Sequence, residues 1–196
     1  MATNEYPVNF EIDFLECHDR LTSFFRLLWV VPVLVVLCIL TSENGGGIAG
    51  GLTVATALMI IFRQLYPRWW FDFALELNRF SARVCAYMFL MTNRYPSTVD
   101  KQSVHLDIEY PDVKKDLNRW MPLVKWFLAI PHYVVLAFLI VAATVATIIA
   151  WFAILFTGRY PKSLFDFVVG VARWGIRVNA YAFLLITDKY PPFSLS

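Results

Sequence analysis

Two segments of this sequence carry charged side chains at helical spacing among apolar residues. Seven residues make up the pattern: Asp72, Glu76, Arg79 and Arg83 in the first segment, and Asp166, Arg173 and Arg177 in the second. The first four are spaced i, i+4, i+7 and i+11, so they lie along one face of a helix. Carboxylates and guanidinium groups on such a face can bind lipid headgroups, line a polar path or pair with each other.

The composition predicts that these segments lie in or on a membrane. Apolar residues make up 59% of the 196 positions, and aromatic residues make up 17%. Charged residues make up only 16%, compared with about 25% in an average soluble protein. A globule of this size cannot bury so much apolar surface, whereas a bilayer can. The formal net charge of +2 gives no indication of nucleic-acid binding.

The chain is a tandem duplication of one unit. Residues of the same type recur at an offset of 94 positions, including Tyr66 and Tyr160, Asp72 and Asp166, Arg79 and Arg173, and Arg83 and Arg177. Further upstream, Arg26 and Pro32 match Lys125 and Pro131. So many matches in the same order predict two units, residues 1–98 and 99–196.

Each unit is expected to contain a short strand, a helical hairpin and a third helix. The strands are predicted from the alternation of apolar and polar residues at 8–14 and 104–110. The hairpins are predicted at 21–62 and 120–156, and the third helices at 69–91 and 164–186. The predicted fold class is an all-α membrane protein of two tandem repeats. Each repeat is a transmembrane hairpin followed by an amphipathic interfacial helix, with a short strand before the hairpin.

The second hairpin is predicted from length alone. As one helix, residues 120–156 would be about 55 Å long, which exceeds the bilayer hydrocarbon core of about 30 Å. We therefore expect a fold-back near 140–143. The first hairpin has a polar, glycine-rich turn at 41–47, whereas 140–143 contains no polar residue. A long tilted helix at 133–156, preceded by a surface helix, is the alternative.

Three interpretations of the third helices remain open. They lie in the interface plane with their arginines near lipid phosphates, they span the membrane along a polar path, or their charges form internal pairs. Charge placement favours hairpins with in-plane third helices, because all seventeen Lys and Arg residues then lie on one side of the membrane. Positive charge is retained in the cytoplasm. We therefore expect a multi-pass protein of the cell inner membrane with cytoplasmic termini.

Tyrosine and arginine residues at the repeated Tyr-Pro steps are predicted to anchor the chain at the membrane surface. Proline begins or ends a helix, tyrosine favours the headgroup level, and arginine binds phosphate. The predicted anchors are Tyr66, Tyr95, Arg159, Tyr160 and Tyr190.

The second unit also carries a set of specific motifs. They are Gly158-Arg159-Tyr160-Pro161, Phe165-Asp166-Phe167, Arg173-Trp174, Ala180-Tyr181 and Asp188-Lys189-Tyr190-Pro191-Pro192-Phe193. With these motifs the chain resembles a bacterial membrane-protein family known only as a domain of unknown function. The first unit departs from them, with Gln64-Leu65 in place of Gly158-Arg159. The resemblance implies a class of membrane protein and supplies no activity.

The chain carries no motif of a known catalytic site. There is no Walker-type loop, no dinucleotide fingerprint, no Gly-x-Ser-x-Gly elbow and no His-Glu-x-x-His. His132 lies alone in the main apolar runs, where a capping or interfacial role is expected rather than metal or haem ligation. We therefore expect no enzyme activity, no cofactor and no metal site.

The expected function is that of a non-enzymatic membrane module, either a scaffold or an accessory subunit of a membrane complex. It would contact anionic lipid through Arg79, Arg83, Arg173 and Arg177. The expected partners are membrane lipids, further copies of the chain or other membrane-protein subunits, and not nucleic acid. The alternative is a small transporter or channel subunit with a polar path along Asp72, Glu76 and Asp166.

Overall fold

A two-stranded sheet joins the two units. The computed structural model describes residues 6–41, 48–98, 100 and 102–195. Strand β1 (Val8–Ile12) pairs antiparallel with β2 (Val104–Ile108), and Phe10 lies opposite Leu106. Alternate residues of both strands are buried, so the sheet has an apolar inner face and a polar outer face. Both predicted strands are confirmed, and each unit supplies one strand of a shared sheet.

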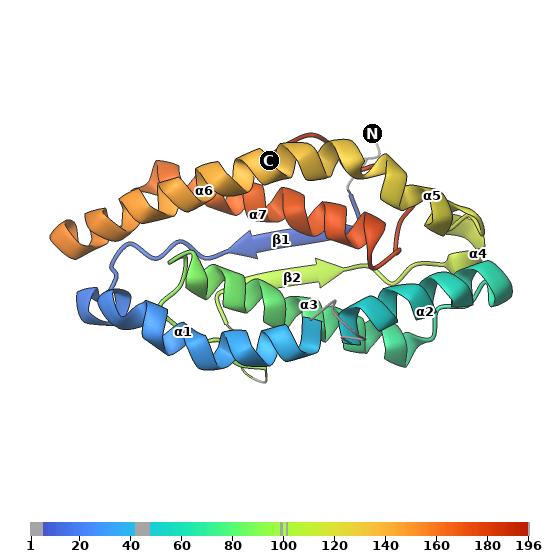
Figure 1. Ribbon diagram of the computed structural model, residues 1–196, viewed down its shortest axis with the longest axis horizontal. Helices are drawn as coiled ribbons and strands as arrows, with labels where there is room; N and C mark the ends of the chain where they lie inside the picture. The colour runs from blue at the N-terminus through green and yellow to red at the C-terminus, as the bar shows by residue number, and fades with distance from the viewer. Residues whose placement is uncertain (1–5, 42–47, 99, 101, 196) are drawn as a thin grey trace.

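Helices α3 (Arg68–Met88) and α7 (Lys162–Ala182) pack on this sheet in an exchanged arrangement. Helix α3 of the first unit packs on β2 of the second, and α7 packs on β1 of the first. Figure 1 shows the two strands between α7 and α3. Because each helix contacts the strand of the other unit, the units are interlocked.

Both helices end before the predicted residues 91 and 186. The chain reverses direction shortly after each helix, where Leu90 and Leu185 adopt left-handed φ values of 61° and 57°. These are matching positions of the two units, so the same uncommon conformation of a non-glycine residue is kept twice.

Apolar helices form the two long edges of the molecule. Helices α5 (Met121–Leu128) and α6 (Ile130–Thr157) follow one edge, and α1 (Arg20–Thr41) and α2 (Ile48–Arg63) follow the other (Figure 1). A short helix, α4 (Val113–Asp116), precedes α5. The two edges meet at both ends of the molecule, where α1 contacts α6 and α2 contacts α5.

The predicted fold-back near 140–143 is wrong. Helix α6 continues through Ile140–Ala143 without a break, because this stretch has no proline, glycine or polar residue to end a helix. The break comes earlier, at Ala129, between α5 and α6, where Pro131 cannot donate the hydrogen bond that a continuous helix would need. The alternative, a long helix preceded by a shorter one, describes the second unit.

The predicted hairpin of the first unit is not confirmed. Helices α1 and α2 run end to end along one edge in Figure 1 and do not lie side by side. Of the predicted turn at 41–47, residues 42–47 lie outside the described residues.

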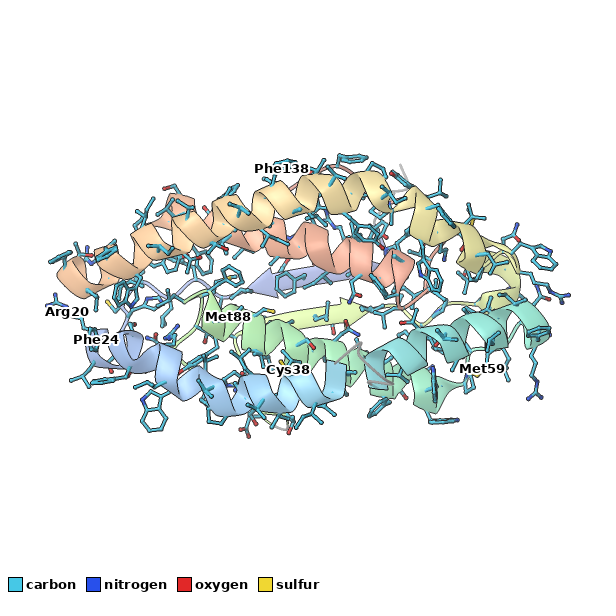
Figure 2. The ribbon with its side chains drawn as sticks, in the orientation of Figure 1. Arg20, Phe24, Cys38, Met59, Met88 and Phe138 are labelled. Atoms are coloured by element: carbon cyan, nitrogen blue, oxygen red, sulfur yellow. The ribbon has the colours of Figure 1, made fainter. Side chains whose placement is uncertain are left out.

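Within the described ranges, one helix, α6, is long and apolar enough to cross a membrane. Helix α1 is bent by 48°, and it becomes a second candidate if its two parts count as one span. Helix α6 differs from the core helix of a soluble protein because only 28% of its most apolar window is buried. Phe138, for example, is 75% exposed and projects outward from α6 (Figure 2). Contiguous exposed apolar surface of this kind marks contact with a membrane or another protein.

The ends of the edge helices show how the repeats diverged. Gly158 caps α6 with a left-handed φ of 75°, and Gln64 holds the matching position after α2 with φ of 45°. The departure of Gln64 from the motif of the second unit therefore leaves the backbone turn in place. Glycine adopts this conformation without steric cost, whereas glutamine is strained there.

Candidate functional site

Arg79 on α3 and Arg173 on α7 each bind the strand of the other unit. Arg79 Nε donates to the Leu106 carbonyl oxygen at 2.8 Å, and Arg173 Nε donates to the Phe10 carbonyl oxygen at 3.0 Å. The two bonds are equivalent by the repeat. These side chains therefore satisfy backbone acceptors within the protein.

The remaining charged residues of the pattern divide into paired and exposed groups. Arg79 also forms ion pairs with Glu76 at 2.6 Å and with Asp107 at 2.9 Å. Arg83 donates to the carbonyl oxygen of Ser97 at 2.7 Å, in the segment that follows α3. Asp72 and Asp166 are exposed and form no ion pair with the described residues.

Arg177 lies beside the N-terminal segment. Its carbonyl oxygen accepts a hydrogen bond from the Tyr6 hydroxyl at 3.2 Å. Burial lowers the pKa of the Arg177 guanidinium, and the nearby charge of Arg173 lowers it further. The neighbouring Tyr6 opposes both effects.

Two of the predicted surface anchors are core residues instead. Tyr66 is 1% exposed and Tyr160 is 3% exposed, because their rings pack edge-on against Phe71 and Phe165 next to the sheet. The Tyr66 hydroxyl donates to the Leu184 carbonyl oxygen at 3.3 Å, and burial raises the pKa of Tyr66 to about 12. The other three anchors, Tyr95, Arg159 and Tyr190, are exposed.

The sequence context of His132 predicted a capping or interfacial role, but the residue lies in the core. Its side chain is 0% exposed, and Nδ1 accepts a hydrogen bond from Trp174 Nε1 at 3.1 Å. The ring of Phe193 stacks on the imidazole at a centroid distance of 4.0 Å. Among the described residues, no group of three or more His, Cys, Asp or Glu side chains is placed to hold a metal ion.

The sequence reasoning missed two buried cations that occupy matching positions. Arg26 and Lys125 are 3% and 0% exposed, and both lie under the C-terminal end of a long helix, α3 or α7. A single cation within an otherwise apolar run was the available signal. Their acceptors, Tyr87 in the first unit and Thr187 in the second, are backbone carbonyl groups near those helix ends.

Two adjoining cavities lie between α3 and α7. The larger one has a volume of about 420 Å³ and also contacts α2 and α5; it is called the polar cavity because asparagine, serine, threonine and tyrosine side chains lie among its mostly apolar lining. The apolar cavity has a volume of about 290 Å³ and also contacts the sheet and α6. Asn78, Ser81 and Asn179 line both, so the cavities meet at these residues. Such volumes are in the range of pockets that bind small molecules, roughly 300–1,000 Å³.

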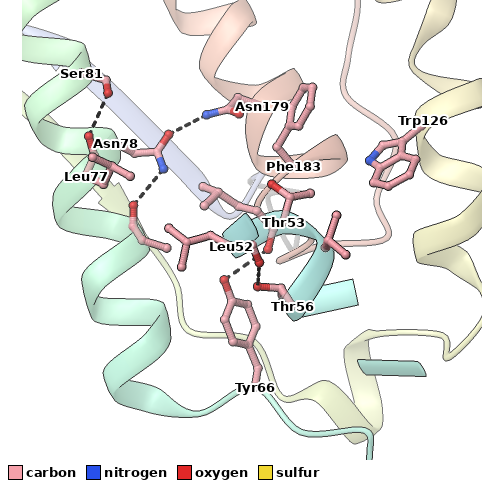
Figure 3. A pocket seen from close by; sticks show the side chains of 13 residues that line it. Leu52, Thr53, Thr56, Tyr66, Leu77, Asn78, Ser81, Trp126, Asn179 and Phe183 are labelled. Carbon is pink, nitrogen blue, oxygen red and sulfur yellow. Dashed lines mark hydrogen bonds between the residues drawn. The ribbon is translucent and has the colours of Figure 1, made fainter. Parts of the chain in front are cut away.

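A pair of asparagines from the two units marks the junction of the cavities. Asn179 Nδ2 donates to Asn78 Oδ1 at 2.5 Å, and Asn78 Nδ2 donates to the Ala74 carbonyl oxygen at 2.8 Å (Figure 3). Ser81 and Thr56 also face the polar cavity. Both hydroxyls donate to carbonyl oxygens of their own helices. Thr56 Oγ1 also accepts a hydrogen bond from Trp70 Nε1 at 2.8 Å, so Ser81 keeps the greater acceptor capacity.

The apolar cavity exists because the helices face each other through small side chains. Ala82 and Cys85 of α3 lie across from Ala172 and Gly175 of α7. A Cβ atom added at Gly175 would meet no atom within 4 Å. Sequence patterns show which face of a helix is apolar but not the partner of that face, so the cavity was not predictable from the repeat.

Both cavities are lined by uncharged residues within the described part of the chain. None of the described residues that line either cavity is charged, and none pairs a nucleophile with a base. The arrangement offers neutral amide and hydroxyl groups beside an apolar space. It is suited to holding a molecule with one uncharged polar part and one apolar part.

Comparison with known families identifies the family of this chain. A family model described as Domain of unknown function (DUF4389) matches residues 20–99 and matches again at residues 119–194. The chain belongs to this family. The double match confirms that the protein consists of two tandem units. No curated protein and no solved structure matches the chain.

Proposed function

We propose that this DUF4389 protein is a non-enzymatic membrane module that lies along the surface of the bilayer. In this arrangement the apolar edge helices face lipid and the polar face of the sheet faces water. The module would serve as a scaffold or accessory subunit in the inner membrane. The proposal is carried by one observation: most of the exposed apolar residues lie on the edge helices, whereas the exposed residues of the sheet are polar.

The edge helices supply the apolar part of this segregation. Phe138 and Phe156 of α6, Phe127 of α5 and Leu28 of α1 are each between 69% and 78% exposed. The sheet exposes only polar side chains, which are Asn9 and Glu11 of β1 and His105 and Asp107 of β2. Exposed charges and aliphatic surface of this extent favour a position at the membrane–water boundary.

The shared direction of the elements favours an in-plane orientation. Helix α6 and both strands run along the long axis of the molecule (Figure 1). If α6 crossed the bilayer, the exposed carboxylate of Glu11 and the ion pair of Asp107 with Arg79 would lie at membrane depth. An in-plane orientation leaves these groups in water.

Anionic-lipid contact is assigned to cations other than the four arginines of the sequence pattern. Arg79, Arg83 and Arg173 already donate to acceptors inside the protein. The two ends of the molecule carry further exposed cations: Arg20, Arg159 and Lys162 at one end, and Arg63 and Arg68 at the other. These side chains are placed to meet lipid phosphates at the edge of an in-plane module.

A depth profile along α6 tests the orientation. Spin labels would be attached to single cysteines at Val134, Val141, Val145 and Phe152, in a variant with Cys17, Cys38 and Cys85 replaced by serine. The protein would be reconstituted in vesicles of phosphatidylethanolamine and phosphatidylglycerol. An in-plane module gives similar depths at all four sites, from the relative collision rates with oxygen and with a water-soluble nickel complex. A label at Asp107 serves as the control and should collide mainly with the nickel complex.

A profile that is deepest in the middle of α6 and shallow at both ends would overturn the in-plane orientation. It would support the second candidate, a transporter or channel subunit whose polar sheet faces are covered by another copy. Asp72, Glu76 and Asp166 line neither cavity, so a polar path along them would have to form between copies.

A further inference from the structure

We propose that the two adjoining cavities form one binding site for a neutral lipid of the monoacylglycerol class. The hydrocarbon chain would occupy the apolar cavity, and the glycerol headgroup would bind in the polar cavity beside Asn78, Ser81 and Asn179. This inference rests on the proposed association with a membrane but not on the orientation of the protein there.

The apolar cavity has the lining that a hydrocarbon chain requires. Three helices supply most of its walls. The lining residues are Ala82 and Ala86 on α3, Phe89 just after α3, Val168 and Ile176 on α7, and Leu136 and Ile140 on α6. Phe10 and Ile12 of the sheet also contribute. Transfer of each methylene group from water into such a space is favourable. The cavity is open enough for Cys85 to be solvent-accessible.

The polar cavity selects an uncharged headgroup. It presents the Asn179 and Asn78 amides and the hydroxyls of Ser81 and Thr56, with no charged side chain among its described lining residues. Within the described part of the chain, Asn179 Oδ1 accepts no hydrogen bond, so it can accept one from a glycerol hydroxyl. A phosphate or carboxylate would lose its hydration without gaining a cation, which is strongly unfavourable.

The position of the site suits uptake from a membrane. The polar cavity is bounded by Val54 of α2 and Trp126 of α5, which are exposed on the apolar edges of the molecule, and by the buried Leu52. A lipid leaving the bilayer would therefore move between apolar surfaces. The asparagine pair connects the two units, so the bound lipid would contact both repeats at once.

Cys85 provides a direct measure of occupancy. The labelling would use wild-type Cys85 in a Cys17→Ser, Cys38→Ser background, with a maleimide reagent and protein in detergent micelles. A mildly alkaline buffer raises the thiolate fraction and keeps the reaction measurable. Monoolein should slow the alkylation about ten-fold at a concentration near ten times its Kd. Oleoyl-lysophosphatidylglycerol, with a charged headgroup, should give little protection at the same concentration.

A matched pair of glycine variants tests the cavity itself. Gly175→Leu places a side chain in the apolar cavity, where an added Cβ meets no atom within 4 Å. Gly51→Leu makes the same change on α2, where an added Cβ also has open space, and Gly51 lines neither cavity. Both variants should fold, because leucine has a higher helix propensity than glycine. Monoolein retained in native mass spectrometry should be lost from Gly175→Leu and kept by Gly51→Leu.

The outcomes separate this inference from the proposed function. Equal retention of monoolein by both variants, or equal protection of Cys85 by the charged lipid, overturns the neutral-lipid site. In that case a protein that still partitions into vesicles leaves the membrane module standing. Failure of the wild-type chain to associate with vesicles overturns the proposed function instead.

Discussion

Each unit buries one cation near the C-terminal end of a long helix, but the groups that bind the cation differ. In the first unit, Arg26 donates to the Tyr87 carbonyl oxygen at 3.1 Å and to Asn93 Oδ1 at 3.0 Å. In the second, Lys125 donates to the Thr187 carbonyl oxygen at 2.8 Å and pairs with Asp188 at 2.8 Å. Each cation also lies near a tyrosine ring, at 4.5 Å in the first unit and 5.2 Å in the second.

The comparison shows which feature the fold requires. The last carbonyl groups of a helix have no partner within the helix, and the negative end of its dipole favours a cation there. Arg26 meets this requirement directly at Tyr87, in the last turn of α3, whereas Lys125 binds Thr187, which lies beyond the end of α7 at Ala182. The counter-group differs, because a guanidinium can divide its donors between two neutral acceptors, whereas an ammonium is a compact charge. Of these two cation sites, only the one in the second unit therefore contains an ion pair. Burial lowers the pKa of Lys125, and Asp188 opposes this shift.

The largest expected effect is the loss of the cation in the second unit. Lys125→Met leaves the Asp188 carboxylate, which is only 19% exposed, without its cation and with the Asn118 backbone N–H at 2.6 Å as its remaining donor. Removing one member of a buried ion pair costs about 3 kcal/mol or more. Arg26→Met leaves only neutral acceptors and should cost about 1–2 kcal/mol. Thermal unfolding in detergent micelles, followed by circular dichroism, measures both.

The double variant Lys125→Met, Asp188→Asn sharpens this comparison. It removes the unpaired charge and gives the second unit the amide that the first unit has at Asn93. It should recover part of the stability that Lys125→Met loses. If the double variant is less stable than Lys125→Met, the carboxylate is not the source of the difference between the units.

The second expected effect concerns a polar contact that only one unit has. The hydrogen bond between Trp174 and His132 in the second unit corresponds to the apolar residues Phe80 and Val33 in the first. His132→Val should cost about 2 kcal/mol, because the indole N–H is left buried without an acceptor. Adding Trp174→Phe removes that donor and reproduces the first unit. The double variant should therefore cost less than the sum of the two single variants, as a thermal double-mutant cycle would measure. Simple additivity would show that the hydrogen bond contributes nothing.

The sequence predicted the elements better than their partners. Alternation predicted strands at 8–14 and 104–110, and the structure has them at Val8–Ile12 and Val104–Ile108; the offset of 94 residues located α3 and α7. Alternation shows which side of a strand is apolar but not what it pairs with, so the exchange of strands between units was not predictable. The fold-back failed because residues 140–143 contain nothing that ends a helix, and α6 continues through them.

The candidate site was less accessible to sequence reasoning than the fold. Arg79 and Arg173 were correctly grouped by spacing, but their acceptors, the backbone carbonyls of Leu106 and Phe10, have no sequence signature. The cavities depend on the placement of Gly175 opposite the small residues of α3, which is a tertiary feature. The tyrosines of the Tyr-Pro steps were misplaced because an aromatic ring with one polar atom suits the buried core as well as an interface.

The smallest expected effect is a difference in pH dependence between the units. His18, buried in the first unit, corresponds to the buried Leu117 in the second. His18 Nε2 donates to the Leu90 carbonyl oxygen at 2.9 Å, and Nδ1 has no partner among the described residues. A second proton would add a buried N–H without an acceptor. Burial accordingly lowers the pKa of His18 below its usual 6.5, and the charge of Arg26 adds to this shift against the opposing hydrogen bond.

The direction of the pH effect follows from this lowered pKa. Above pH 6.5 the imidazole is neutral in both states, and its contribution to stability is complete. Below that pH the unfolded chain binds a proton that the folded chain excludes, so stability falls with pH until the folded pKa is reached. The loss should be about 1 kcal/mol over the first pH unit. His18→Leu, which gives the first unit the residue of the second, should flatten this part of the profile, whereas Leu117→Ile should leave it unchanged. An unaltered slope in His18→Leu would assign the acid sensitivity to the carboxylates instead of to the histidine.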